Sequence, residues 1–598
     1  MNLASFKEIS DKAYNAFQRF PITLLWTILG SIYCIYFIGK DGGDFFETHL
    51  NVFMTLVIGV SWLIAIQFLI EQFPNPKKWQ WTKMVLLGLL FLFYWQLPTL
   101  VGHNDDPTYY VRFMLYFIAG HLGILFAPFI KSWNKNAHWN YIKSVGFSIG
   151  RSALFSGVLY LGLVLALLAL ESLFDIKISG KRYGQLFVFC LGTVNTWIYL
   201  SDFPKQILLQ TTIYFHKALE VFVKYILIPL VLLYLIILYA YSLKILIQWE
   251  LPQGWVSYLV TALAILGFAV QHIIDPIQKT LKSWSINTFH PWFYILLLPM
   301  VVLLFVAIFR RIDDYGFTEN RYFVLLLAFW ILGVTLYLLF SKGKRLKVLS
   351  ISLFILALLS SFGFWGTFSI SEKSQINQFK KVYLEVMKSD KLANQAQYRQ
   401  LTSIIDYLAD RKLVSKLDPI IGFSTHSIRL DTIENSKITY HHNTPQILLD
   451  HMDIKIDPDI NFNYNDLYYN LYDGNTNSHS YPISGFDYFA ELNFSDSGDN
   501  DIMEIGELWV KFDEKNTRLL LLDPKKKDTL LVIPIENKLR KLAKHGYNLN
   551  NAKKEELTIT SSAEGIYAKV VLTQLGFYMD RDSISLHNGE IFLFLKQQ

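Results

Sequence analysis

The chain has 598 residues, of which 52% are hydrophobic and only 17% are charged. Soluble domains average about 25% charged residues, so this composition excludes an ordinary soluble protein and indicates a membrane protein. Residues 1–370 carry 28 basic and 17 acidic side chains, whereas residues 371–598 carry 27 and 32. A basic excess confined to the apolar part is typical of loops beside anionic lipid. We therefore expect membrane lipid, and no nucleic acid, as a partner.

Eleven apolar stretches fill the first 370 residues, and most are long enough to cross a bilayer as a helix. The predicted spans are 21–38, 50–70, 84–101, 110–130, 145–173, 183–200, 222–247, 256–274, 292–309, 322–340 and 348–368. The fifth is overlong, which favours a tilt or an extension beyond the hydrocarbon core, and Asn195 and Thr196 interrupt the sixth. We predict a membrane all-α polytopic bundle of about eleven transmembrane helices over residues 1–370.

Basic residues in the loops predict the orientation of the bundle. With a cytoplasmic N-terminus, seventeen Lys and Arg side chains fall on the inner side and seven on the outer side. The inner set is Lys7, Lys12, Arg19, Lys77, Lys78, Lys83, Lys131, Lys135, Lys143, Lys205, Lys217, Lys279, Lys282, Lys342, Lys344, Arg345 and Lys347. The outer set is Lys40, Lys177, Lys181, Arg182, Arg310, Arg311 and Arg321. An odd number of spans then places the C-terminal domain on the outer face of the cytoplasmic membrane.

The C-terminal part has the pattern of a soluble domain. Apolar residues recur at spacings of three and four from 376 to 408, which predicts a helical neck over 371–415. From Thr432 onward they alternate with a period of two, between turn signals. We predict that 416–598 is a soluble α+β domain of mainly antiparallel strands, with a short helix at 536–544.

The sequence contains no recognisable catalytic or nucleotide-binding motif. The histidines lack zinc spacing, and no H-E-x-x-H or G-x-S-x-G pattern occurs. The acidic segment 457–466 resembles a calcium loop, but Phe462 stands where such a loop needs glycine. Both cysteines, Cys34 and Cys190, lie in apolar stretches. We expect no metal, no cofactor and no autonomous catalysis.

Ionisable residues within or beside the spans are costly in lipid unless they are paired or hydrated. They are Arg112, His121, Arg151, Glu171, Asp202, Lys224, His272 and Asp275. For those near span ends, snorkelling of the side chain to the interface is the simpler interpretation. His121 lies in the middle of its predicted span and Arg151 several residues inside its own. We therefore single out these two as candidate polar positions within the membrane.

The densest group of charged residues is the loop that joins the ninth and tenth spans, from 310 to 323. Its candidate site residues are Arg310, Arg311, Asp313, Tyr315, Thr318, Glu319 and Arg321. Three arginines on the outer side oppose the positive-inside trend, so something must compensate them. Pairing with the local acids is one interpretation, and a bound anion such as a lipid phosphate is the other. Thr318 is also placed to N-cap the tenth helix.

Three motifs resemble those of one known family. They are Tyr-Gly-Phe-Thr-Glu-Asn-Arg-Tyr-Phe at 315–323, the Leu-Phe-Ser-Gly-Val-Leu-Tyr-Leu-Gly core within 150–174, and Ser-Asp-Phe-Pro at 201–204. They are similar to the signature of a bacterial multi-pass membrane family described as a domain of unknown function (DUF4153), mostly from Bacteroidetes. The resemblance covers the membrane half and extends to 483–488. It implies a bacterial cell-envelope protein and brings no catalytic residues to carry over.

Three functions stay open at this stage. The first is a non-catalytic membrane protein whose outer-face domain binds a partner, such as another envelope protein, or a ligand. The second is a transporter or lipid-handling protein that acts through the membrane half. The third is a membrane-embedded transferase on lipid-linked substrates, for which Asp313 or Glu319 would supply the reactive group. The missing catalytic motif favours the first.

Overall fold

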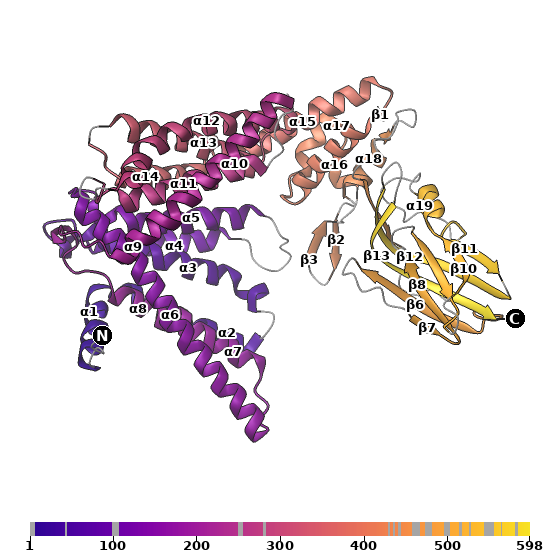
Figure 1. The fold of residues 1–598 in the computed structure, drawn as a ribbon, viewed down its shortest axis with the longest axis horizontal. Coiled ribbons are helices and arrows are strands. Elements are labelled where there is room, and N and C mark those ends of the chain that lie inside the picture. The colour runs from indigo at the N-terminus through magenta and orange to yellow at the C-terminus, as the bar shows by residue number, and fades with distance from the viewer. Residues whose placement is uncertain are drawn as a thin grey trace. The chain divides into compact units, whose positions relative to one another are not determined.

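The structure is a computed structural model. It describes residues 6–41, 45–97, 107–248, 255–278, 283–341, 343–428, 431–434, 437–440, 444–456, 467–472, 481–495, 503–513, 517–524, 528–542, 555–563, 565–579 and 584–597. The chain divides into two compact units, Met1–Asp457 and Pro458–Gln598. The first contains all the long apolar helices, and the second contains the two larger β-sheets (Figure 1).

Within the described residues, eight helical segments are long and apolar enough to cross a membrane. A helix can do so because it satisfies its own backbone hydrogen bonds. They comprise α2 (Pro21–Asp41), α3 (Phe45–Ile70), α5 (Pro107–Phe126), α6 (Lys135–Phe174), α9 to α10 (Lys217–Gln248), α11 (Trp255–Ile274), α12 (Trp284–Tyr315) and α13 (Glu319–Phe340). The predicted polytopic α-helical membrane fold is confirmed.

The other three predicted spans are helical too, but they are short or interrupted. Helix α4 (Trp81–Gln96) has 16 residues, and the predicted end of its span, 98–101, lies outside the described residues. Helix α14 (Lys347–Ser360) has 14 residues and ends before the predicted 368. The sixth span consists of α7 (Gly180–Phe187), the π-helical turn η4 (Val188–Val194) and α8 (Asn195–Ser201). The count of eleven spans is therefore approximate.

Contacts between helix ends sort into two sets, as alternating passes through a membrane require. One set contains Tyr116 with Ser361 and Tyr322 with Trp365. The other contains Arg19 with Glu71, Lys135 with Asp275 and Lys347 with Phe129. Each pair joins ends that the eleven-pass topology places on the same side. We call the first side the neck side, because the chain leaves the last apolar helix there.

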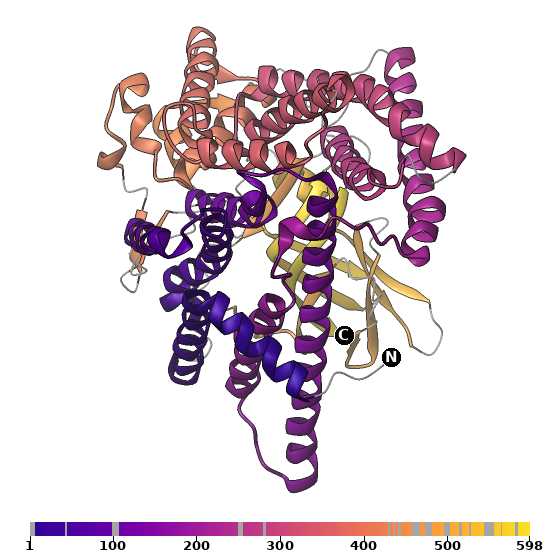
Figure 2. The ribbon, with the colours of Figure 1, turned by 90° about the vertical axis from the view of Figure 1, so that its left-hand side faces the viewer.

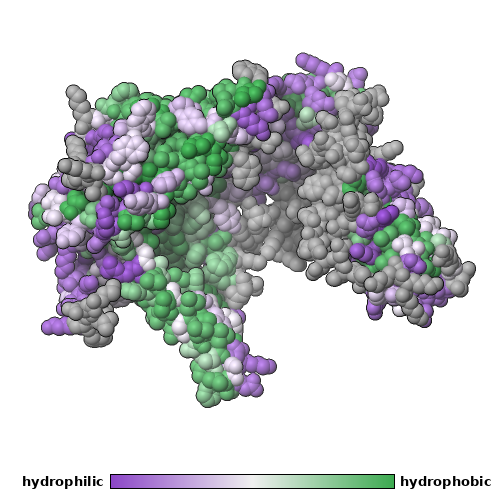
Figure 3. All heavy atoms as spheres, viewed as in Figure 1, coloured by the Kyte–Doolittle hydropathy of each residue, from purple (hydrophilic) through white to green (hydrophobic). Residues whose placement is uncertain are grey.

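Helix α6 is much longer than a membrane crossing needs. Its 40 residues correspond to about 60 Å, against about 30 Å of hydrocarbon. Asn134 caps its N-terminus by accepting a hydrogen bond from the backbone N–H of Ala137. Its C-terminal half extends past its neighbours with an exposed apolar surface (Figures 1, 2 and 3). The expectation of an overlong fifth span is met by this extension.

Four further helices follow the apolar ones in the first unit. They are α15 (Thr367–Lys388), α16 (Gln395–Ala409), α17 (Asp418–Ile421) and α18 (Thr444–His451). Two small strand pairs accompany them, β1 (Leu392–Ala393) with β4 (Lys455–Ile456) and β2 (Asp431–Glu434) with β3 (Lys437–Tyr440). Helices α15 and α16 correspond to the predicted neck, and we call them the neck helices. Helix α18, which is only eight residues long, is not predicted by the sequence pattern.

The second unit contains two antiparallel sheets. Its strands are β5 (Leu467–Tyr472), β6 (Tyr488–Ser495), β7 (Met503–Ile505), β8 (Leu508–Asp513), β9 (Arg518–Leu522), β10 (Thr529–Pro534), β11 (Thr558–Ala563), β12 (Ile566–Met579) and β13 (Ile584–Gln597). One sheet has the order β10-β9-β8-β7, and the other β11-β12-β13-β6, with β5 beside the second half of β12. A short helix, α19 (Glu536–Leu542), follows β10.

A single hydrophobic core lies between these two sheets. Leu519 and Leu521 of β9 are fully buried and share one cluster with Val570 and Leu572 of β12. Their neighbours Leu520 and Leu522 are less buried, as the period of two in a strand requires. This confirms the predicted antiparallel α+β character of the C-terminal domain.

Candidate functional site

The loop predicted as a polar site lies on the neck side, between α12 and α13. Gly316 ends α12 with φ of +71°, and its N–H donates to the Ile312 carbonyl at 2.8 Å. A Cβ atom at this position would lie 2.9 Å from Ser374 Oγ of α15. Glycine is therefore required both for the backbone conformation and for the close approach of the neck.

Side chains of the neck helices satisfy the backbone of this loop. The Gln375 side-chain amide donates to the carbonyls of Tyr315 at 3.0 Å and Phe317 at 2.7 Å. The N–H of Phe317 in turn donates to Ser374 Oγ at 2.8 Å. Two more glutamine amides of the neck donate to the carbonyl of Asp314. The loop is therefore the seat on which the neck packs.

Glu319 forms the buried centre of this contact, with 5% of its surface exposed. Its carboxylate accepts hydrogen bonds from Arg411 Nε at 2.9 Å and Nη2 at 3.1 Å. The Tyr407 hydroxyl donates to the same carboxylate at 2.9 Å, and the Arg411 guanidinium lies 3.7 Å above the Tyr407 ring. Burial, together with the charge of Glu319, raises the pKa of Tyr407. We call Asp314, Phe317, Glu319 and their neck partners the neck joint.

The arginines of the loop differ in their surroundings. Arg310 Nε pairs with Asp314 across one helical turn at 3.0 Å, with about half of the Arg310 side chain exposed. Arg321 Nη1 donates to the carbonyls of Tyr315 at 3.2 Å and Gly316 at 2.9 Å. Arg311 has no ion pair within the described part of the chain. Local ion pairing therefore neutralises one of the three arginines, Arg310, within the described residues, while backbone carbonyls accept hydrogen bonds from Arg321.

The remaining candidate residues of the loop are Thr318, Tyr315 and Asp313. Thr318 occupies the N-cap position of α13 but makes no side-chain capping hydrogen bond. Tyr315 places its ring 5.4 Å from the Arg321 guanidinium. Asp313 is exposed and makes no ion pair within the described residues. These contacts do not test the predicted binding of an anion at this loop, which stays a prediction.

The two candidate intramembrane residues lie apart from this loop. Arg151 of α6 pairs with Asp202 at 3.1 Å, just beyond the end of α8. His121 of α5 bonds through Nδ1 to the Phe117 carbonyl at 2.8 Å. Because a carbonyl only accepts, this bond assigns the proton to Nδ1. Arg151 therefore has an internal partner, while His121 keeps Nε2 as an acceptor when the ring is neutral.

His121 lines a cavity of about 560 Å³ in the membrane half, which we call the membrane cavity. Five elements surround it: α2, α3, α5, α6 and the helical segment of η4 with α8. Most of its lining is apolar. Its polar side chains are Thr27, Ser31, Ser61, His121, Ser152, Asn195, Thr196 and Tyr199. Mostly apolar pockets of about 300–1,000 Å³ with a few polar groups are typical of ligand sites.

One wall of the membrane cavity is formed by a π-helical turn. The turn η4 supplies Val188, Leu191 and Gly192, and Asn195 follows it directly. Asn195 Oδ1 is buried and has no hydrogen-bond partner within the described residues. Single π-helical turns occur often at functional sites. From the sequence alone, Asn195 indicates only an interruption of a span.

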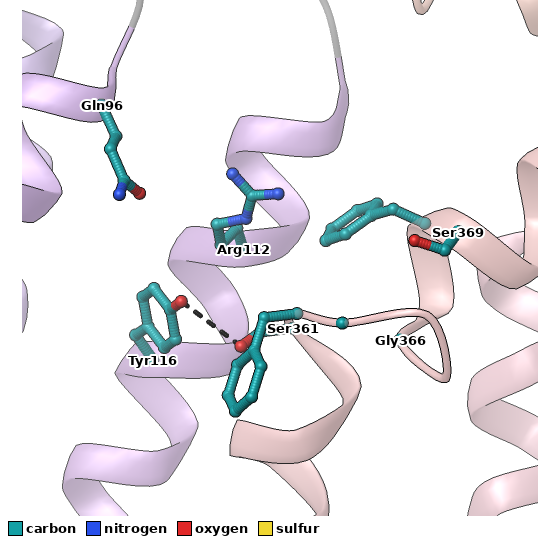
Figure 4. A pocket seen from close by; sticks show the side chains of 9 residues that line it. Gln96, Arg112, Tyr116, Ser361, Gly366 and Ser369 are labelled. Atoms are coloured by element: carbon teal, nitrogen blue, oxygen red, sulfur yellow. Dashed lines mark hydrogen bonds between the residues drawn. The ribbon is translucent and has the colours of Figure 1, made fainter.

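A second cavity, of about 450 Å³, lies on the neck side where four helix ends meet (Figure 4). We call it the arginine pocket. Its lining residues are Gln96, Arg112, Tyr116, Ser361, Phe362, Gly363, Gly366, Phe368 and Ser369. The hydroxyls of Tyr116 and Ser361 are 3.3 Å apart on one wall. The position of Arg112 near the end of its predicted span favours snorkelling, and only the fold brings the other walls of the pocket to it.

The side opposite the neck holds a cluster of buried histidines. His138 and His272 place their rings 5.4 Å apart, and Nε2 of each is buried without a partner in the described residues. Asp275 pairs with Lys135 at 2.9 Å beside them. No group of three or more potential metal ligands occurs in the described ranges. The calcium-like segment 457–466 lies outside those ranges.

Comparison with known proteins relates the membrane half and part of the neck to a family. An uncharacterized protein of Pasteurella multocida (strain Pm70) is 28% identical over 302 residues, which are 48% of this chain and 50% of that protein. The chain thus matches about half the length of this curated relative. No solved structure matches the chain. The family model covers 25–397 and does not reach 483–488. The chain belongs to the family described as a domain of unknown function (DUF4153).

Proposed function

We propose that the protein resides in the cytoplasmic membrane of a bacterium, with its N-terminus inside and its C-terminal domain on the outer, periplasmic face. The excess of Lys and Arg in one set of loops supports this orientation. Three of those lysines, Lys279, Lys282 and Lys342, lie outside the described residues. The grouping of helix ends into two sides is consistent with it.

Site-specific labelling tests this orientation. In a chain whose two cysteines are replaced by alanine, Ser484→Cys probes the C-terminal domain and Gly343→Cys probes the opposite side. A membrane-impermeant maleimide applied to intact spheroplasts should label the first variant and reach the second only after lysis. Labelling in the reverse order would overturn the proposed orientation.

For the activity, we propose that the membrane half binds the apolar part of a lipid or similar amphiphile, which makes this a lipid-handling protein. The observation that carries the proposal is the membrane cavity. Its apolar walls suit a hydrocarbon chain, and Asn195 and His121 offer unsatisfied acceptors to a polar group near it. The proposed function contains no catalytic step.

A second candidate is binding of an envelope protein or ligand by the outer domain. The neck joint favours it, because a buried ion pair between Glu319 and Arg411 couples the membrane helices to the neck. Movement of the neck would then bias the helices. The transferase interpretation retains only the exposed Asp313 as a reactive group, since Glu319 is already engaged by Arg411 and Tyr407.

Filling the membrane cavity tests the lipid-handling proposal. Ala153 lines the cavity, whereas the adjacent Leu154 does not and is 61% exposed. A phospholipid with a diazirine in its acyl chain should cross-link to peptides of α2, α3 and η4 in the unaltered chain. Ala153→Trp should remove most of this cross-linking, and the control Leu154→Trp should keep it. Equal cross-linking in both variants would sink the proposal.

A further inference from the structure

The arginine pocket places a cation among partners that do not neutralise it. Arg112 Nε is buried and has no hydrogen-bond partner within the described residues. The guanidinium lies 5.0 Å from the centre of the Phe368 ring, and no carboxylate pairs with it in the described residues. A π face attracts a cation but cannot accept the directed hydrogen bonds of a guanidinium. Within the described residues, Arg112 Nε is therefore left without a hydrogen-bond acceptor.

The opposite wall of the arginine pocket is the N-terminus of α15. Gly366 is its N-cap residue and supplies no side-chain capping bond. The first-turn N–H groups of a helix have no partner within the helix, and its dipole is positive at this end. Gly366, Phe368 and Ser369 all line the cavity. A Cβ atom at Gly366 would lie 2.6 Å from the Phe362 carbonyl oxygen, so the tight turn that leads into α15 requires glycine here.

The carbonyl groups beside the pocket are, in contrast, already satisfied. The Ser361 hydroxyl donates to the Leu358 carbonyl at 2.7 Å, and Trp365 Nε1 donates to the Leu359 carbonyl at 3.0 Å. The C-terminal end of α14 thus offers few free acceptors to Arg112. Unsatisfied groups on both walls are donors, which is the pattern of an anion site.

We infer that the arginine pocket binds the phosphate of a membrane lipid head group. Arg112 would hold two phosphate oxygens with its guanidinium fork, and the first turn of α15 would donate to a third (Figure 4). This inference does not depend on the membrane cavity, which has a different set of lining residues. The two proposals can therefore fail separately.

The surroundings of the pocket favour a lipid over free phosphate. Large aromatic side chains next to it are exposed: Trp95 by 72%, Phe364 by 74%, Phe362 by 52% and Trp365 by 41%. Exposed aromatic residues at the ends of membrane helices gather at the depth of lipid head groups. A phosphate at that depth belongs to a lipid of the neck-side leaflet.

Two aspartates provide the strongest internal alternative. Asp105 and Asp106 precede α5 by two residues and one residue, in the segment 98–106, which lies outside the described residues. A carboxylate from this segment would satisfy Arg112 in place of a phosphate. The test therefore has to include these residues.

Titration of the purified full-length chain tests the inference. Phosphatidylglycerol is added to the delipidated protein in detergent, and bound lipid is counted by native mass spectrometry. Arg112→Gln should weaken one binding step about tenfold or more, the effect of losing a charge-assisted hydrogen bond. The control Arg182→Gln removes an arginine of the same side that bonds to Gln185 and does not line the pocket. Equal binding by Arg112→Gln and the unaltered chain would overturn the proposal.

Further arms separate the sources of the anion. Millimolar inorganic phosphate should displace little phosphatidylglycerol, and complete displacement would overturn the lipid assignment. The double variant Asp105→Asn with Asp106→Asn should bind as the unaltered chain does. Binding that occurs only in this double variant would show that the chain itself fills the pocket, which also overturns the inference.

A further variant tests the pocket by adding a negative charge to the chain and not by removing Arg112. Ser369→Glu places a carboxylate on the pocket wall opposite Arg112. It should abolish the phosphatidylglycerol step and raise the thermal midpoint in lipid-free detergent, whereas Ser369→Gln should do neither. A Ser369→Glu protein that binds the lipid normally would count against the pocket.

Discussion

Two arginine sites on the neck side differ in how their charge is balanced. In the neck joint, Arg411 has 14% of its side chain exposed and meets the carboxylate of Glu319, of which 7% is exposed. In the arginine pocket, Arg112 meets a ring and hydroxyl groups. The Glu319–Arg411 pair is complete within the described residues, whereas Arg112 Nε has no acceptor among them and is proposed to take one from a lipid. The charged loop between α12 and α13 therefore forms a structural contact with the neck, while the isolated Arg112 lines a cavity.

The largest loss of stability should come from Glu319→Gln, which leaves Arg411 buried without its counter-ion. The neck joint would then resemble the arginine pocket, where an arginine has no carboxylate partner among the described residues. Removing one partner of a buried pair costs about 3–5 kcal/mol in the free energy of unfolding. Thermal denaturation in detergent should show a clearly lower midpoint, with faster proteolysis of the neck. The control Glu372→Gln loses a more exposed partner of Lys416 and should shift the midpoint much less. Equal shifts would mean that burial does not distinguish the two pairs.

A smaller effect is expected from Tyr407→Phe, which removes one hydrogen bond to the Glu319 carboxylate. A hydrogen bond to a charged group contributes about 1.5–3 kcal/mol. The raised pKa of Tyr407 also predicts a pH dependence. Above its ordinary pKa of 10.0, the unfolded chain has released the phenol proton that the folded chain still holds, so stability falls as pH rises.

Comparison of the unaltered chain with Tyr407→Phe isolates the contribution of the Tyr407 phenol to stability. The stability advantage of the unaltered chain over Tyr407→Phe should be full below pH 10 and shrink above it. Chemical denaturation across this range measures the difference. A constant difference would contradict the assignment of a buried, protonated Tyr407.

The smallest effect should come from Arg310→Ala. Its pair with Asp314 spans one helical turn and is largely exposed, and such pairs contribute about 0.3–0.5 kcal/mol. The thermal midpoint should hardly change, and phosphatidylglycerol binding should stay normal. A loss of lipid binding here, with Arg112→Gln unaffected, would move the anion site from the arginine pocket to the predicted loop.

The neck joint was partly predictable from sequence. Its loop residues Asp314 and Glu319 stand near three arginines of the same loop in the chain, and pairing among these loop residues is one of the two interpretations of the sequence. The pair actually formed by Glu319 could not be predicted, because Arg411 lies 92 residues later. The order of residues in the chain does not indicate this contact, because it forms only when α16 packs against the loop. The same holds for Arg151, whose partner Asp202 comes from another span.

The sequence by itself determined the class of the fold. Runs of apolar residues predict membrane helices, because a backbone in lipid must satisfy its own hydrogen bonds, and a period of two predicts strands such as β9 and β12. The tertiary structure decided where cavities and unpaired groups lie. The arginine pocket takes Gln96, Arg112, Ser361 and Ser369 from four separate elements. A cavity is a property of surfaces that meet in space, so only the packing of helix ends shows that Arg112 Nε is buried without a partner among the described residues.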